Sequence, residues 1–270
     1  MMFVCPKCKK KLNISGTSAS CAEGHSYDKA RGGYYNLLLS NTGGVHGDNK
    51  EMVLARRAFL GEGHYKPLAE KIAETILAVT ECAPTLLDAG CGEGYYTDFV
   101  ERALFARDGE SHVSAFDISK DAVREVAKKN PRISLAVAGS YHMPLPDAAF
   151  DIVLNTFSPL ALIETRRVLR PGGVFVMAIP AEEHLFELKS AIYDTPYKNI
   201  VEDTALEGLE IISDIPVRYT MSLSGAESIR SLFMMTPYAY RTKRENAERV
   251  LALTGLECTA DFRVLAYKKL

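Results

Sequence analysis

Four residues near the amino terminus have the types and spacing of a metal site. Cys5 and Cys8 form a Cys-x2-Cys pair, and Cys21 and His25 form a Cys-x3-His pair after twelve intervening residues. Such ligands can close tetrahedrally around Zn²⁺. A segment of about 35 residues is too short for a core of its own, so the metal would supply its folding energy. We expect a structural zinc site; the alternative, unrelated redox cysteine pairs, gives His25 no role.

A second group of residues suited to chemistry surrounds three glycines. Asp88 ends a short apolar run, where it can accept hydrogen bonds from a ligand, and three glycines follow at every second position: Gly90, Gly92 and Gly94. Glycine lets the chain turn sharply and approach a ligand closely. Glu93 lies inside this turn and would repel the pyrophosphate of a dinucleotide. The turn therefore favours a ligand with a cationic or amino group.

The elements that position these residues alternate between strand and helix. Apolar runs predict strands over 84–89, 112–116, 133–138, 150–154 and 174–179, with helices predicted over 95–105, 120–129 and 160–169. This alternation is typical of an α/β fold with a parallel, doubly wound sheet, which binds ligands at the carboxyl ends of its strands. Asp117 and Asn155 end two of these strands, and Asp117 suits a ribose diol. The loop 139–146 is placed to border the adenine ring of a bound ligand.

The remaining segments frame this core. Helices are expected over 50–59 and 63–80, an insertion with a helix over 181–199, and then a strand, two helices and a final strand over 209–223, 227–234, 245–253 and 258–267. The two long strands would form an antiparallel edge. Tyr65 lies at the start of the helix expected over 63–80. It either lies over the glycine-rich turn or packs against the first turn of that helix. His184 lies near the same crevice, where it either contacts a ligand or is structural.

Composition limits the function classes. The 270 residues carry a net charge of -2, so any nucleic-acid affinity must come from local patches. No signal peptide and no apolar run of about 18 residues is present, which predicts a cytoplasmic protein without a membrane partner. Six cysteines should then be reduced. We divide the chain into a zinc module over 1–38, a polar, glycine-rich linker over 39–49 and an α/β domain over 50–270.

The amino-terminal module is rich in cations and aromatic residues. Its cations outnumber its acids, Glu23 and Asp28; they are Lys7, Lys9, Lys10, Lys11, Lys29 and Arg31. Four aromatic residues lie among them: Phe3, Tyr27, Tyr34 and Tyr35. Cations beside exposed aromatic rings suit phosphate contact and base stacking on RNA. The other interpretation is that the rings fill the core of the module and the lysines are solvated.

Motifs along nearly the whole chain resemble one family, the bacterial 23S rRNA (guanine-N1-)-methyltransferases. They are Cys5-Pro-x-Cys8, Gly33-Tyr34-x-Asn36-Leu37, Ala55-Arg56-Arg57-x-Phe59-Leu60, Gly63-His64-Tyr65, Leu87-Asp88-x-Gly90-Cys91-Gly92-Glu93-Gly94-Tyr95-Tyr96, Asp117-Ile118-Ser119-Lys120, Pro171-Gly172-Gly173, His184-Leu185-x-Glu187-Leu188 and Met235-Thr236-Pro237. The resemblance implies a Rossmann-like methyltransferase fold with a mainly parallel seven-stranded sheet, S-adenosylmethionine (SAM) and Zn²⁺ as cofactors, and methylation of guanine N1 in a hairpin loop of 23S rRNA domain II.

The resemblance also implies roles for single residues. It assigns zinc to Cys5, Cys8, Cys21 and His25, and SAM contact to Tyr65, Gly92, Glu93 and His184. With the strand-end residues, the predicted cofactor-binding set is Tyr65, Asp88, Gly90, Gly92, Glu93, Gly94, Asp117, Ile118, Asn155 and His184. Asn155 can form hydrogen bonds to the edge of the guanine, but its amide cannot accept the N1 proton. No residue is named as the general base. Tyr141 and Phe157 are candidates to stack an extruded guanine.

Two other functions stay open at this point. One is a SAM-dependent enzyme for a small molecule, with the zinc module as an oligomerisation device. The other is a non-catalytic RNA-binding protein with a SAM-type fold, against which the intact Asp88, Glu93 and Asp117 argue. The sequence does not determine the oligomeric state, and a homodimer is one of the alternatives that stay open.

Overall fold

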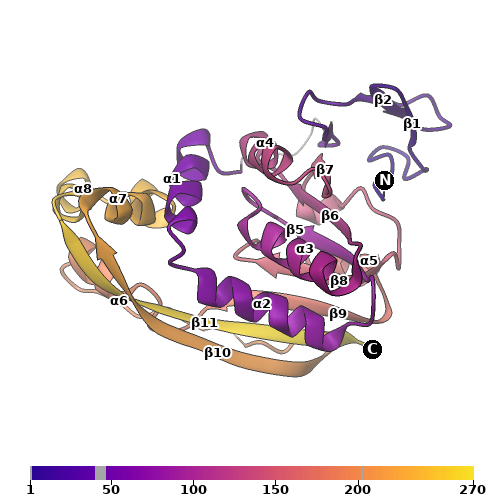
Figure 1. Cartoon of the computed structure of the whole chain (residues 1–270). Helices are drawn as coiled ribbons and strands as arrows, with labels where there is room; N and C mark the ends of the chain where they lie inside the picture. Colours follow the sequence, from indigo (N-terminus) through magenta and orange to yellow (C-terminus); the bar gives the residue numbers. More distant parts are fainter. Residues whose placement is uncertain (1, 40–46, 202) are drawn as a thin grey trace.

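The computed structural model describes residues 2–39, 47–201 and 203–270. Its centre is an eight-stranded sheet in the order β10-β11-β9-β8-β5-β6-β7-β4 (Figure 1). Strands β4 to β9 run parallel, and β10 and β11 form the antiparallel edge. The strands are β4 (Tyr35–Asn36), β5 (Thr85–Ala89), β6 (His112–Asp117), β7 (Ser134–Val137), β8 (Phe150–Thr156), β9 (Leu169–Pro180), β10 (Leu209–Ser224) and β11 (Gly255–Lys269).

Side chains that alternate along β5 enter two separate cores. Leu86 packs in the core that holds the helices α2 (Lys66–Val79), α3 (Tyr95–Asp108) and α4 (Lys120–Lys129). Its neighbour Leu87 points to the opposite face, which α5 (Leu162–Val168) and the amino-terminal module cover. Period-two alternation thus gives a parallel sheet buried on both faces. The α/β fold predicted from the sequence is confirmed.

The amino-terminal module adds a strand to this sheet. It contains a small sheet of β1 (Asn13–Ser15), β2 (Ser18–Ser20) and β3 (Ser26–Asp28), and its last strand, β4, pairs in parallel with β7. The central sheet therefore has eight strands, where the resemblance implied seven. Phe3, Tyr34 and Tyr35 are buried, which supports the interpretation that these rings fill a core. The division into domains stays a prediction, and most of the expected linker lies outside the described residues.

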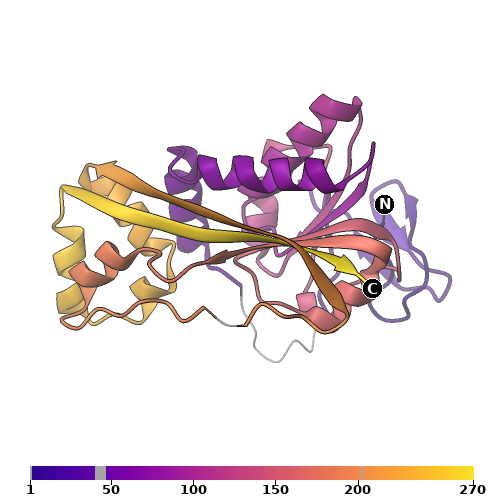
Figure 2. The same cartoon turned by 90° about the horizontal axis from the view of Figure 1, so that it is seen from below.

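The carboxyl-terminal part forms a long ribbon with helices at its far end. Figure 2 shows β10 and β11, in orange and yellow, running from the sheet to this helical cluster. The cluster holds α6 (Phe186–Ile192), α7 (Ala226–Met234), the 3-10 turn η2 (Pro237–Tyr240) and α8 (Arg244–Leu251). Helix α1 (Lys50–Gly61) packs against α7 and so links the cluster to the core. No helix within the described ranges is long and apolar enough to cross a bilayer.

Candidate functional site

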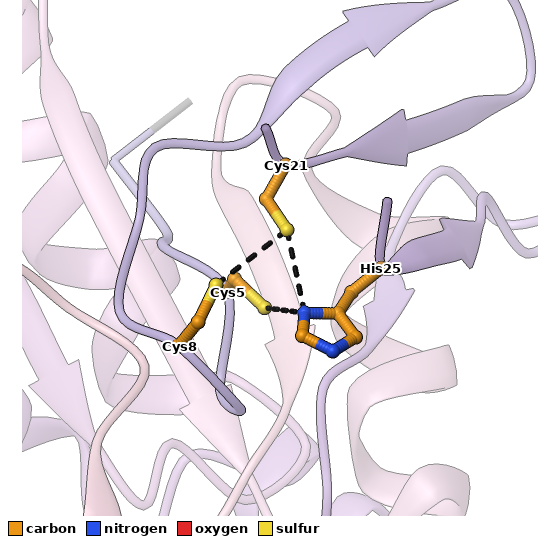
Figure 3. A group of neighbouring side chains, drawn as sticks. All are labelled: Cys5, Cys8, Cys21 and His25. Carbon is orange, nitrogen blue, oxygen red and sulfur yellow. Dashed lines mark hydrogen bonds between the residues drawn. The ribbon is translucent and has the colours of Figure 1, made fainter. Parts of the chain in front are cut away.

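The predicted metal ligands converge on one point of the module. Tight turns carry each pair: the Lys9 amide donates to the Cys5 carbonyl at 2.8 Å, and the Gly24 amide to the Cys21 carbonyl at 3.0 Å. The ligand atoms of Cys5, Cys8, Cys21 and His25 lie within 4.8 Å of one another (Figure 3). The four side chains thus lie together, as their spacing led us to expect, and their role as zinc ligands stays a prediction.

The distances within the cluster suit a tetrahedral metal. Sγ of Cys8 and Sγ of Cys21 are 3.5 Å apart, and Nδ1 of His25 lies 3.5 Å from the Cys5 sulfur and 3.4 Å from the Cys21 sulfur. Zn–S bonds of about 2.3 Å and Zn–N bonds of about 2.0 Å give tetrahedral edges of roughly 3.5–3.8 Å. The Nδ1 atom of His25 therefore faces the metal position.

Hydrogen bonds prepare Cys5 to bind a cation. Burial opposes ionisation of this thiol, but the Tyr27 hydroxyl, 3.3 Å from the sulfur, and the backbone amides of Cys8 and Lys7 lower the pKa of Cys5 to about 6. A thiolate is the form that binds metal. The donor set and its electrostatics fit Zn²⁺.

A cavity of about 1030 Å³ lies at the carboxyl ends of the strands. Six predicted cofactor residues line it: Asp88, Gly90, Gly92, Glu93, Asp117 and Ile118. The glycine-rich turn is held over β6, because the amides of Gly90 and Cys91 both donate to the Phe116 carbonyl, at 2.9 and 3.0 Å. Asp117 accepts from the amides of Gly92 at 3.0 Å and Ser119 at 2.7 Å, which fixes its carboxylate at the cavity wall.

Two buried carboxylates in this cavity retain free acceptor atoms. Oδ2 of Asp88 accepts from the Thr97 hydroxyl at 2.6 Å, whereas Oδ1 of Asp88 and Oε1 of Glu93 have no partner among the described residues. Burial raises the pKa of Asp88 to about 7. Burial also raises the pKa of Glu93, although the positive charge of the nearby Arg56 guanidinium acts to lower it. Buried acceptors without partners are costly and mark a place for ligand donors. The ammonium group that SAM carries fits these two acceptors.

Four predicted cofactor residues are not part of the cavity lining. Gly94 packs against α4, where a Cβ would lie 2.8 Å from a Val126 methyl group, and Asn155 is buried, with its Nδ2 donating to the Pro159 carbonyl at 3.5 Å. Tyr65 and His184 lie behind Phe262, whose ring centroid is 5.0 Å and 4.4 Å from theirs. Phe262 in turn contacts Phe157 on the cavity wall. Roles in SAM binding for these four remain predictions.

Sequence reasoning missed an arginine in this cavity. Arg56 on α1 lines it, forms an ion pair with Asp48 and donates to the Met235 carbonyl at 3.2 Å. Its guanidinium thus joins the segment before α1 to the segment after α7, across the cavity wall. In the sequence Arg56 stood out only as part of a family motif, and no local pattern could show that distant segments meet around it.

Exposed aromatic rings surround the mouth of the cavity. Tyr141, Phe157 and Tyr240 line it and are 64%, 44% and 48% exposed. They come from three separate segments: the 3-10 turn η1 (Ser140–His142), the end of β8 and η2. Phe157 has a φ of 56°, in the region that a non-glycine residue rarely adopts. Backbone strain at such a position is typical of functional sites. Tyr240 was not predicted from the sequence.

Comparisons with known proteins agree with this geometry. A model described as Methyltransferase domain matches residues 87–177, and a zinc-ribbon model described as RlmA, N-terminal, matches residues 3–41. The YcgJ protein from Bacillus subtilis has a similar solved structure, with a TM-score of 0.50 and 14% identity over 74% of this chain and 98% of that chain. That likeness shows the fold.

Two relatives match at nearly full length. The 23S rRNA (guanine(748)-N(1))-methyltransferase of Streptomyces fradiae is 35% identical over 93% of this chain and 91% of its own. YxjB of Bacillus subtilis (strain 168), provisionally named as a 23S rRNA (guanine-N(1)-)-methyltransferase, is 30% identical over 98% of this chain and 96% of its own. On this evidence the chain belongs to the 23S rRNA (guanine-N1-)-methyltransferase family.

Proposed function

We propose that this protein transfers a methyl group from SAM to N1 of a guanine in a hairpin loop of 23S rRNA domain II. The observation that carries the proposal is the cavity at the strand ends, in which Asp88, Glu93 and Asp117 face a mouth ringed by exposed aromatic side chains. Full-length similarity to rRNA guanine-N1-methyltransferases supports the choice of substrate.

The chain's own residues supply position and environment. When bound, SAM provides an electrophilic methyl group on a sulfonium, and its transfer to N1 releases one proton. Asp117 would hold the ribose diol, and the free oxygens of Asp88 and Glu93 would accept from the ammonium end. Gly90 and Gly92 let the backbone approach the ligand with positive φ values of 90° and 54°. Placing both reactants in one cavity lowers the barrier by proximity.

The guanine must leave its hairpin to reach this cavity. Tyr141, Phe157 and Tyr240 offer flat faces on which an extruded base can stack. The zinc site would fold the amino-terminal module, whose exposed cations Lys11, Lys29 and Arg31 suit contact with RNA phosphates. In this proposal residues 1–38 form the RNA-recognition module and 50–270 the methyltransferase domain, in the cytoplasm where ribosomal RNA is found.

Methylation assays test the proposal directly. Purified protein is incubated with radiolabelled SAM and 23S rRNA transcripts, and reverse transcription maps stops, because a methyl group on N1 blocks base pairing. The expected result is label in the RNA and one strong stop at a guanine of the domain II hairpin. Label in small metabolites alone, or none in RNA, would reject this function.

A further inference from the structure

The backbone that follows the cavity loop η1 is tied to its surroundings at three successive carbonyl groups. The Met143 carbonyl accepts from Nζ of Lys9 at 3.0 Å and from Nη2 of Arg167 at 3.0 Å, which occupies both of its lone pairs. The Pro144 carbonyl accepts from the Val4 amide at 2.8 Å, and the Leu145 carbonyl from Nη1 of Arg167 at 2.8 Å. Two of these four donors come from the zinc module.

Both module donors adjoin the metal turn. Val4 directly precedes the ligand Cys5, and Lys9 directly follows the ligand Cys8. The turn between them is closed by the Lys9 amide to the Cys5 carbonyl, at 2.8 Å, and the Cys5 amide to the Lys10 carbonyl, at 2.9 Å. Lys9 itself has a left-handed φ of 60°. A metal that holds Cys5 and Cys8 together therefore also fixes the Val4 amide and the backbone from which the Lys9 side chain extends.

Helix α5 holds the same segment from the other side. Oε2 of Glu164 accepts from the Met143 amide at 2.7 Å, and Arg167 pairs with the Glu164 carboxylate through Nε at 2.7 Å and Nη2 at 2.8 Å. Met143, Pro144 and Leu145 are buried. Loss of the partly buried Lys9 contact would leave the Met143 carbonyl with Arg167 as its one remaining donor, which would weaken the attachment of this backbone segment.

The tethered segment continues into the cavity wall. Gly139, Ser140, Tyr141 and His142 line the cavity and end where Met143 begins. We propose that the zinc turn positions this wall for SAM, with Lys9 as the positioning residue, so that metal occupancy and SAM affinity are linked in the absence of RNA. The inference rests on the proposed use of the cavity for SAM.

Substitution of Lys9 tests the link. Lys9→Met keeps most of the side chain and removes the donor, Lys9→Arg restores a donor, and Lys7→Met is the matched control on the same turn, where the side chain is exposed. Calorimetry should show SAM affinity weaker by roughly 3- to 30-fold in Lys9→Met, near wild type in Lys9→Arg and unchanged in Lys7→Met. Hydrogen exchange over 139–146 should rise in Lys9→Met alone, with zinc content equal in all four proteins.

Metal removal gives a second measurement if Lys9→Met loses zinc. Wild-type protein treated with a chelator should lose SAM affinity and recover it when Zn²⁺ is restored. SAM affinity and exchange that stay at wild-type levels, in Lys9→Met with zinc bound or in the metal-free protein, would overturn the link. Methylation of rRNA would then still support the proposed function, whereas wild-type protein that binds no SAM would overturn both.

Discussion

The Tyr65 hydroxyl lies 3.3 Å from Nε2 of His184, and both side chains are buried. The Asp261 amide donates to Nδ1 of the same ring at 3.4 Å, so Nε2 carries the proton and donates to the Tyr65 oxygen. Burial lowers the pKa of His184 to about 3, which keeps the ring neutral. This pair joins the start of α2 to the segment before α6, behind the wall of the cofactor cavity.

Tyr65→Phe should separate a structural role from a cofactor contact. The change removes the acceptor for the buried Nε2 proton of His184, so the free energy of unfolding should fall by about 1–3 kcal/mol, as measured by urea denaturation. SAM affinity, measured by calorimetry, should stay within about twofold, because the hydroxyl faces His184 rather than the cavity. A far larger loss of affinity would instead support the direct SAM contact implied by the family resemblance.

Asp117→Ala should weaken SAM binding strongly. The variant loses the proposed ribose acceptor and also the acceptor for the amides of Gly92 and Ser119, so the glycine-rich turn loosens. Charged hydrogen bonds contribute about 1.5–3 kcal/mol, which predicts roughly 10- to 150-fold weaker binding in calorimetry. Zinc content should be unchanged. Asp121→Ala, a half-exposed acid on α4 four residues after Asp117, is the control, and equal SAM affinity in both variants would reject the ribose role.

Local signals explain why much of the site was predictable. The strand, glycine turn and helix around Asp88 use period-two alternation, positive φ values and a helix start, all of which are read within about twenty residues. Ser119 directly precedes α4 and its hydroxyl accepts from the Ala122 amide, so this helix start is likewise specified by neighbouring residues. The proximity of Cys5, Cys8, Cys21 and His25 was predictable because each pair lies on a short turn.

Long-range contacts explain what was missed. Strand β4 has two residues, Tyr35 and Asn36, which pair with Ala136 and Val137 from a distant part of the chain. No periodicity exists in so short a segment, so the eighth strand and the docking of the module had no local signal. Tyr240 at the cavity mouth is a similar case, because only the tertiary fold brings η2 to the cavity that η1 also lines.

Binding of SAM should depend on pH through Asp88. Burial raises the pKa of Asp88 from 3.8 to about 7, although the hydrogen bond from the Thr97 hydroxyl acts in the opposite direction. Between these two pH values the folded protein keeps a proton that the unfolded chain has lost. Stability without ligand should therefore fall as pH rises from about 4 to about 7. A cationic ammonium prefers the ionised form, so SAM affinity should rise with pH up to about 7 and then level off.

Calorimetry from pH 5.5 to 8 measures this dependence. Below pH 7 the affinity should change by up to about tenfold per unit, with release of up to about one proton on binding. Asp88→Asn, which keeps an acceptor but cannot ionise, should remove the component centred near pH 7. A profile that is the same in wild type and Asp88→Asn would contradict the assignment.

Gly90→Ala should damage the cavity more than its backbone strain explains. A Cβ at Gly90, where φ is 90°, would overlap the side chain of Ser158, whereas a Cβ at Gly109, where φ is 78°, meets nothing within 4 Å. Gly109→Ala therefore measures the strain alone, about 1–2 kcal/mol. Urea denaturation should show a larger loss in Gly90→Ala, with weaker SAM binding. Ser158→Gly should restore part of both losses, and equal losses in the two alanine variants would reject the steric account.

Truncation of the aromatic rim should separate base capture from cofactor binding. Phe157→Ala, Tyr141→Ala and Tyr240→Ala each remove one exposed ring from the cavity mouth. Base stacking on an aromatic ring contributes about 1–3 kcal/mol, so kcat/KM for an rRNA hairpin should fall roughly 5- to 150-fold in the variant that loses the stacking ring. SAM affinity should change little, because Asp88, Glu93 and Asp117 are intact.

Ile163→Ala is the matched control for these variants, since Ile163 is 83% exposed on α5 and is not part of the cavity lining. Phe157→Tyr supplies the conservative test, because it keeps a ring at the strained position and should retain most of the activity that Phe157→Ala loses. An rRNA kcat/KM that stays at the control level in all three alanine variants would show that the guanine is held elsewhere. A parallel loss of SAM affinity would show instead that the rings line the cofactor part of the cavity.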